Sequence, residues 1–377
     1  MAHLVSKASN EIQATTHDLI DDQYMPLFLE KTFANEEKNK KSFDGFSDFD
    51  MMYYFINQQK DIDRNRDKNE QTKREYAREL LMFYEHLQNY EYSLQLTYSE
   101  SKNDLSILRT LRKRHVEYYH RVYLATAPLG RGGLPYKKAT LQKKTSIIRS
   151  FFEFLYQKEY IEVPLHESFY KVSLKEEDAP NRDLYYHEVK QLLEYYEDHV
   201  IHYTILLLLA TTGMRARELC EAKWRNVTLE NGQYWLKIIG KGQKERDILL
   251  FPYVYESLLA FRKRRRLPTT LDPLCDTPLI VTFNNKAYSA KYMSNFVTHI
   301  IERTRFDFLY SNGRNGKITA HYFRHFFAIY SLEQGANIQY ISRSLGHSNL
   351  STTQIYLERH LKKQNHAANA WNNKEAF

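Results

Sequence analysis

Apolar residues recur at helical spacing along most of this chain, and one stretch departs from that period. From residue 72 a single helix face would gather Tyr76, Leu80, Phe83, Tyr84 and Leu87, and residues 141–160 repeat the pattern. Only 12 Gly and 9 Pro occur in 377 residues, so few positions would interrupt such helices. Residues 234–251 change to the spacing of two short strands around a Gly-Lys-Gly-Gln-Lys loop at 240–244, which predicts a hairpin. We therefore expect a mainly α fold with a small antiparallel β-hairpin or sheet.

Charge and composition divide the chain into five parts. Residues 1–70 form an N-terminal extension with 9 Lys and Arg against 14 Asp and Glu, a net charge of −5. We expect a helical domain over 71–165, a polar linker over 166–183, a second domain over 184–365 and a tail over 366–377. After residue 70 there are 45 Lys and Arg against 32 acids, a net charge of +13. The positive charge after residue 70 favours a polyanionic partner, or it simply keeps a large protein soluble. The acidic extension favours a contact with another protein.

Several protein classes are excluded by composition. The longest apolar run, Thr204 to Ala210, is far short of the roughly 18 residues that a membrane-spanning helix needs. Two cysteines, Cys220 and Cys275, cannot build a disulfide framework or a four-cysteine zinc site. Met1 to Lys7 is not followed by the apolar stretch of a secretory signal. We expect a cytoplasmic protein without a membrane segment.

Polar side chains that could take part in catalysis are concentrated in the second domain. Arg215 stands where an apolar helix breaks and another begins, and Glu218 follows at a spacing that lets it orient the guanidinium. An ordinary surface ion pair is the alternative for these two residues. His321 and His325 have the spacing of a zinc-binding pair, but zinc hydrolase signatures need Glu where Tyr322 stands, so we predict no metal site.

These groups belong to an ordered set: Arg, a hairpin Lys, His-x-x-Arg, Gly-His and Tyr. The segments are Thr-Gly-Met-Arg-Ala-Arg-Glu-Leu (212–219), Gly-Lys-Gly-Gln-Lys-Glu-Arg (240–246), Thr-Ala-His-Tyr-Phe-Arg-His (319–325) and Leu-Gly-His-Ser (345–348), ending at Tyr356. In this order and spacing the sequence resembles the tyrosine recombinase (phage integrase) family over about residues 72–360. The resemblance implies a two-domain DNA clamp, with a helical core-binding domain followed by an α/β catalytic domain. Arg217 departs from the small residue usual there, and the motif register assigns the catalytic arginine to Arg215.

The resemblance also implies a role for each residue of the set. Arg215 and Arg324 would hold the two non-bridging oxygens of a phosphodiester, and His347 would donate a third hydrogen bond. Tyr356 would attack phosphorus and form a 3′-phosphotyrosyl link. His321 would take the phenol proton, Lys241 would protonate the leaving 5′-oxygen, and Glu218 would support the arginine. Neither a metal nor a nucleotide cofactor is expected.

Double-stranded DNA is the implied partner, mostly through its phosphates. The candidate contacts are Lys137, Lys138, Lys143, Lys144, Arg149, Lys244 and Arg246. Family members act as homo-tetramers on paired sites, each donating its last helix to a neighbour, and an accessory DNA-bending or directionality protein can take part. Ala367, Ala370 and Trp371 would supply an apolar contact for that exchange, or the tail is simply frayed.

We interpret the chain as the integrase or transposase of a mobile genetic element, in a bacterial cytoplasm and on the nucleoid when bound to DNA. A Xer-type resolvase of chromosome or plasmid dimers is the alternative within the same chemistry. A DNA-relaxing topoisomerase uses a similar Arg, Lys and Tyr set, but the Gly-His motif nine residues before Tyr356 favours a recombinase. A catalytically inactive DNA-binding relative is disfavoured because the whole set is intact.

Overall fold

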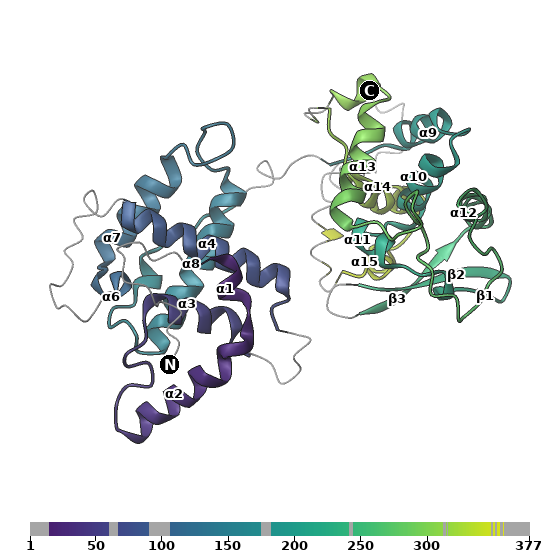
Figure 1. The fold of residues 1–377 in the computed structure, drawn as a ribbon. Coiled ribbons are helices and arrows are strands. Elements are labelled where there is room, and N and C mark those ends of the chain that lie inside the picture. The colour runs from purple at the N-terminus through teal and green to yellow at the C-terminus, as the bar shows by residue number, and fades with distance from the viewer. Residues whose placement is uncertain are drawn as a thin grey trace, which may run out of the picture. The chain divides into compact units, whose positions relative to one another are not determined.

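The chain forms two compact units, residues 1–180 and 181–377, with the division inside the expected linker (Figure 1). The computed structural model describes residues 15–59, 67–89, 106–174, 182–240, 244–311, 314, 316–347, 350, 353, 354 and 357. Among these residues no helix combines the length and apolar character needed to cross a membrane.

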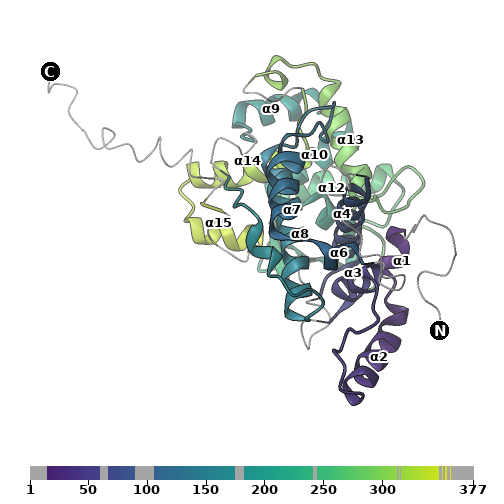
Figure 2. The same cartoon turned by 90° about the vertical axis from the view of Figure 1, so that its left-hand side faces the viewer.

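The N-terminal unit is helical in all its regular elements described here. Its helices are α1 (Thr16–Ile20), α2 (Met25–Glu37), α3 (Asp48–Asn57), α4 (Glu70–Asn89), α6 (Ile107–Thr110), α7 (Lys113–Tyr118) and α8 (Lys138–Gln157). Short 3-10 turns lie at Asp22–Tyr24 and Leu165–Ser168, and α7 continues as a π-helix over Tyr119–Leu124. In both views α2 lies at the edge of the unit (Figures 1 and 2).

The expected helix faces meet in one aromatic core. Phe83 and Leu87 of α4 pack with Phe151 and Phe152 of α8, as the helical spacing predicts. Phe55 of α3 lies in the same core, with its ring 5.2 Å from that of Phe151. The sequence had suggested a separate extension over 1–70, and this boundary is wrong for its described part, because residues 15–59 share the core of the helices that follow.

A buried carboxylate ties α3 to later parts of the unit. Asp48 is 2% exposed and accepts hydrogen bonds from the hydroxyl of Ser106, from the backbone N–H of Leu108 at 3.1 Å and from the phenol of Tyr160 at 2.8 Å. Burial raises the pKa of Asp48, while these hydrogen bonds act in the opposite direction. An acid that the sequence counts as surface charge is therefore a structural residue.

The C-terminal unit places helices around a small sheet. Its helices are α9 (Tyr186–Tyr195), α10 (Val200–Thr212), α11 (Ala216–Glu221), α12 (Pro252–Arg264), α13 (Ala290–Glu302), α14 (Ala320–Glu333) and α15 (Ile338–Leu345), with 3-10 turns at Trp224–Asn226 and Asp307–Leu309. The strands β1 (Val227–Glu230), β2 (Gln233–Ile239) and β3 (Glu245–Leu250) form an antiparallel sheet in that order. Tyr234 pairs with Leu250 and Ile239 with Glu245, which confirms the predicted hairpin and adds β1.

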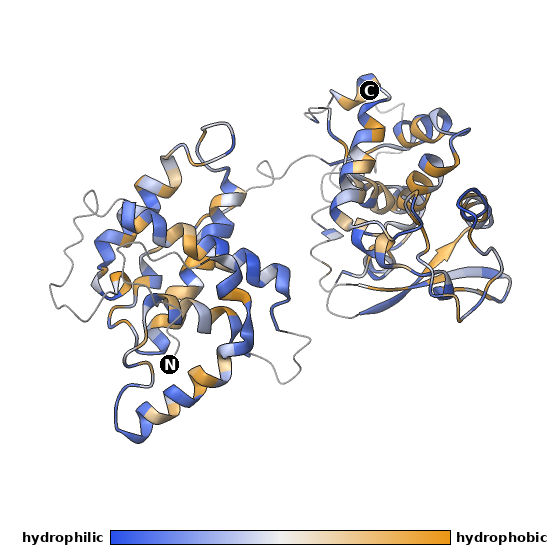
Figure 3. Cartoon of the chain, in the orientation of Figure 1, coloured by the Kyte–Doolittle hydropathy of each residue, from blue (hydrophilic) through white to orange (hydrophobic). Residues whose placement is uncertain are grey.

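The core of this unit surrounds α10. Residues Thr204 to Ala210 are buried, and Figure 3 shows apolar residues gathered on α10 and α14. Arg314 and Glu188 form a buried ion pair, with Nη1 to Oε1 at 2.6 Å, and bring the start of α9 to the loop before α14. The mainly α fold class with a small antiparallel sheet is confirmed.

Candidate active site

Arg215 is presented by the sharp turn between α10 and α11. Gly213 ends α10 with φ of +60°, a left-handed conformation that glycine adopts without strain. A Cβ at this position would lie 2.8 Å from the side chain of Leu345 and 2.9 Å from that of Phe327. Arg215 is the residue before α11, and its side chain is 35% exposed, so its guanidinium is accessible from outside the unit.

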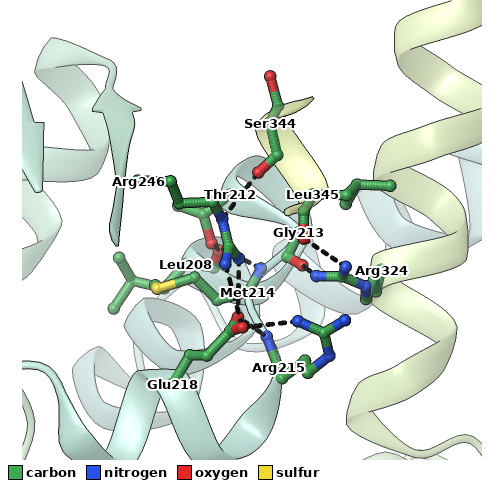
Figure 4. A network of polar contacts seen from close by, with 10 residues as sticks. All are labelled: Leu208, Thr212, Gly213, Met214, Arg215, Glu218, Arg246, Arg324, Ser344 and Leu345. Carbon is green, nitrogen blue, oxygen red and sulfur yellow. Dashed lines mark hydrogen bonds and ion pairs between the residues drawn. The ribbon is translucent and has the colours of Figure 1, made fainter. Parts of the chain in front are cut away.

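Glu218 is the carboxylate at the centre of the site (Figure 4). It is 4% exposed and accepts from Arg215 twice, from the backbone N–H at 2.8 Å and from Nη1 at 2.7 Å. Arg246 of β3 donates to the same carboxylate from Nη1 at 3.1 Å and from Nη2 at 2.8 Å. Burial acts to raise the pKa of Glu218, but the hydrogen bonds from the two arginines outweigh it and the pKa is lowered. The carboxylate is therefore ionised and holds Arg215 and Arg246 together.

Arg324 joins three segments from inside the unit. It lies on α14 and is 1% exposed. Its Nη1 donates to the carbonyl of Gly213 at 2.8 Å, and its Nη2 donates to the carbonyl of Leu345 (Figure 4). The guanidinium of Arg324 thus links α14 to the ends of α10 and α15. The two carbonyls hold the plane of this guanidinium beside Arg215.

His347 follows the turn that ends α15. Gly346 has φ of +66° and closes the helix. The Nδ1 atom of His347 lies 2.7 Å from the hydroxyl of Thr353, which is fully buried. Burial lowers the pKa of His347 to about 4, with Arg324 and Arg215 adding to the effect. The imidazole is neutral at neutral pH, and the bond to Thr353 engages one ring nitrogen.

A second histidine pair lies on α14. The rings of His321 and His325 are 5.0 Å apart at a steep angle. Burial lowers the pKa of His321 to about 4, and the nearby charges of Arg182, Arg324 and Arg215 lower it further. Burial also lowers the pKa of His325, to about 3. Both rings are therefore neutral at neutral pH, and a neutral His321 can accept a proton.

Two residues of the predicted set, Lys241 and Tyr356, lie outside the described residues. The strands on either side of Lys241 are described and end at Ile239 and Glu245. Thr353 and Leu357, which flank Tyr356, are buried in the C-terminal unit, Leu357 against α14 and α15. The structure thus brings together Arg215, Glu218, Arg324, His321 and His347 from three separate segments.

The predicted DNA contacts divide into two groups. Exposed side chains belong to Lys137, Lys138, Lys143, Arg149 and Lys244, and Lys143 pairs with Glu75. Lys144 is 6% exposed and forms a buried ion pair with Glu79, and Arg246 is engaged by Glu218. The charges of Lys144 and Arg246 are used inside the protein, so we remove both from the expected phosphate contacts.

Sequence reasoning missed three parts of the site. Arg246 was assigned to DNA although its place in a strand facing Glu218 was not visible in the spacing. Thr353 carried no signal, because a buried Thr resembles an ordinary core residue, and the sequence considered His325 only as half of a zinc-binding pair with His321. Among the described residues no group of three or more His, Cys, Asp or Glu could hold a metal ion.

Comparison with known proteins agrees with this geometry. The model of the phage integrase family matches residues 182–363, which contain the whole site. Tyrosine recombinase XerC of Pediococcus pentosaceus is 30% identical over 225 residues, or 58% of this chain and 71% of that protein. The chain belongs to the tyrosine recombinase family. XerC of Thermodesulfovibrio yellowstonii is 32% identical over 60% of this chain and 73% of that protein.

Solved structures share the tyrosine recombinase fold. XerH site-specific recombinase bound to difH substrate, in a pre-cleavage complex, aligns with a TM-score of 0.56 and 22% identity over 96% of this chain and 98% of that chain. A lambda integrase dimer bound to a COC′ core site aligns with a TM-score of 0.55 and 14% identity, over 77% of this chain and 89% of that chain. The tyrosine recombinase described here is thus a DNA-binding enzyme, a site-specific recombinase that breaks and rejoins DNA strands.

Proposed function

We propose that this tyrosine recombinase cuts duplex DNA at specific paired sites with Tyr356 as nucleophile and Arg215, Arg324 and His347 as the phosphate-binding groups. The observation that carries the proposal is the convergence of two arginines and a neutral histidine on the turn at Gly213 and Gly346. Permanently charged guanidinium groups offset the charge that builds on the non-bridging oxygens during attack at phosphorus.

In the proposed step one bond to phosphorus forms and another breaks. The phenolic oxygen of Tyr356 forms a bond to phosphorus, and the bond from phosphorus to the 5′-oxygen breaks. The phenol proton passes to His321, whose ring is neutral at neutral pH, and Lys241 gives a proton to the departing 5′-oxygen. The 5′-hydroxyl of a partner strand then reverses the reaction. The covalent ester retains the bond energy, so neither a metal nor a nucleotide enters this proposal.

The nucleophile is proposed to act within its own subunit. Leu357 is fully buried and packs with Ala328, Ile329, Ile341 and Leu345 of the same chain. Thr353, three residues before Tyr356, contacts His347 of the same chain. Contacts on both sides of Tyr356 thus support delivery to the site of the chain that carries it.

The proposed substrate is duplex DNA, contacted by residues of both units, with a homo-tetramer on paired sites and an accessory DNA-bending or directionality protein where needed. Exposed Lys137, Lys138, Lys143, Arg149 and Lys244 are the proposed phosphate contacts. The tail over 366–377, proposed for exchange between subunits, lies outside the described residues.

Two biological substrates are candidates. The ends of a mobile genetic element are the first, on the strength of the acidic N-terminal segment. A site for resolving chromosome or plasmid dimers is the second. It is favoured by the XerC relatives and by the XerH alignment, which spans 96% of this chain and so includes that segment. The presence of the N-terminal segment therefore does not distinguish an enzyme of a mobile element from a dimer resolvase.

A covalent-trap assay tests the proposal. The full chain is mixed with labelled DNA from the ends of its genetic element and from the replication-terminus region of its host, then denatured in detergent and separated on a gel. We expect a slow protein–DNA band that is lost in Tyr356→Phe, while DNA binding by that variant remains. The DNA that gives the band identifies the substrate. A band that persists in Tyr356→Phe would contradict the nucleophile assignment.

A further inference from the structure

Arg246 is bound on two sides by the protein. Its Nη1 and Nη2 donate to the carboxylate of Glu218, and its Nε donates to the backbone carbonyl of Ser344 at 3.0 Å (Figure 4). Its side chain is only 10% exposed. A planar guanidinium can donate two hydrogen bonds to a carboxylate and a third to a carbonyl in one plane, a geometry that the single ammonium nitrogen of a lysine does not reproduce.

Two glycines make room for this side chain. A Cβ at Gly346 would lie 2.8 Å from Nη1 and 3.2 Å from Cδ of Arg246. A Cβ at Gly240 would lie 3.1 Å from the same Nη1. Gly240 follows β2, and Gly346 precedes His347, so Arg246 fills the space where the loop end of the hairpin meets the turn that carries His347.

The charges of Arg215, Glu218 and Arg246 explain what the contact between Arg246 and Glu218 does. Glu218 carries one negative charge and accepts two hydrogen bonds from Arg215 and two from Arg246. With Arg246 present, the two guanidiniums and the carboxylate sum to one positive charge. Without it, the buried carboxylate would have Arg215 as its remaining partner in this cluster and would cancel the charge needed at the phosphate.

We propose that Arg246 is a positioning residue: through Glu218 it orients Arg215 and leaves the charge of that guanidinium uncancelled, and through Ser344 it holds the His347 turn. This inference rests on the proposed function and refines it. It replaces the expectation that Arg246 contacts DNA directly. It also makes the β3 strand part of the catalytic framework, because one side chain of that strand contacts both the arginine support and the histidine turn.

The test compares Arg246→Met with Arg225→Met in the full chain. Arg225 also pairs with an acid, Asp276, at 2.8 Å, but its side chain is 46% exposed and lies outside the cluster. Two quantities are measured: the DNA dissociation constant over a range of salt, and the single-turnover rate of covalent complex formation at saturating protein. Arg246→Met is expected to lower the rate at least about tenfold with DNA affinity unchanged, and Arg225→Met to leave both unchanged.

Other results would overturn the proposal. A weaker affinity with a salt dependence reduced by about one counterion, and an unchanged rate at saturation, would make Arg246 a phosphate contact. A smaller reactive fraction with an unchanged rate would make it a residue of stability alone. In the Arg246→Met background, Glu218→Gln is expected to restore the rate severalfold, because it removes the uncompensated carboxylate. No recovery in this double variant would contradict the charge argument.

A measurement independent of catalysis separates this inference from the proposed function. Hydrogen exchange followed by mass spectrometry is expected to rise in Arg246→Met in two separate segments, residues 213–221 and 341–347. If the wild-type chain formed no Tyr356-dependent complex, the proposed function would fail, while the exchange result would still decide whether Arg246 joins the two segments. Unchanged hydrogen exchange in either segment would show that Arg246 does not link the two segments.

Discussion

Protonation of His325 should make the C-terminal unit sensitive to mild acid. His325 is 7% exposed on α14, and burial, followed by the neighbouring His321, Arg182 and Arg324, lowers its pKa to about 3. In the unfolded chain a histidine titrates near its ordinary pKa of about 6.5. Between these two pH values the unfolded chain binds a proton that the folded chain does not.

The sign and size of the effect follow from this difference. Because the folded pKa is lowered, the stability is complete above pH 6.5 and is lost as the pH falls towards 3. At pH 5 the unfolded histidine is almost fully protonated and the folded one is neutral, which costs about 2 kcal/mol of unfolding free energy. The value at pH 5 changes little whether the folded pKa is 3 or 4, since both lie well below pH 5.

The assay compares His325→Gln with the wild-type protein at pH 7 and pH 5. All three tryptophans, Trp224, Trp235 and Trp371, belong to the C-terminal unit, so urea unfolding followed by tryptophan fluorescence reports on that unit. The wild type is expected to lose about 2 kcal/mol more than the variant over this interval, because the other histidines titrate in both proteins.

The matched control is His187→Gln on α9, where the histidine is exposed. This variant should lose as much stability between pH 7 and pH 5 as the wild type does. Equal losses in His325→Gln and in the wild type would refute the reasoning, whatever the stability of the variant at pH 7.

Two other contacts can be tested by single substitutions. Lys144→Met removes the buried cation from the carboxylate of Glu79 and leaves the exposed Arg78 beside it, and it is expected to lower the unfolding free energy of the helical unit by about 3 kcal/mol. Circular dichroism in urea would measure the change, and Lys143→Met, at a more exposed pair, should cost less than about 1 kcal/mol. Thr353→Val removes the hydroxyl that contacts His347, so covalent complex should form at least about tenfold more slowly, whereas Thr353→Ser should retain the rate. Equal rates for Thr353→Val and Thr353→Ser would show that the hydroxyl does not orient the ring of His347.

Much of the fold and of the site could be predicted because their signals are local. Helices such as α4 and α8 follow from spacing within a few turns, and the hairpin follows from a change of period around a glycine-bearing loop. Arg215 and Glu218 are three residues apart on one helix end, so their contact could be read directly from the sequence.

The errors concern contacts between distant residues. Lys144 and Glu79 are 65 positions apart, and an amphipathic spacing does not show that a lysine at the edge of the apolar face of α8 meets a buried acid of α4. Asp48 is one of the 14 acids counted in residues 1–70, and that count does not show its burial because its partners at 106 and 160 are far away in sequence. Arg246 was assigned to DNA for the same reason, since the sequence does not show the buried carboxylate of Glu218, 28 positions away, that it binds.

The hydrogen bonds of Asp48 also set an order of events during translation. The chain leaves the ribosome N-terminus first, so the core that α3 enters cannot be completed until Tyr160, 112 residues later, has been synthesised. The C-terminal unit has its own closing contact between Glu188 and Arg314, which are 126 residues apart. Because each contact lies within one unit, each unit can complete its core independently of the other. We expect the helical unit to be folded while Arg324 is still untranslated, so that the catalytic groups are the last part of the protein to form.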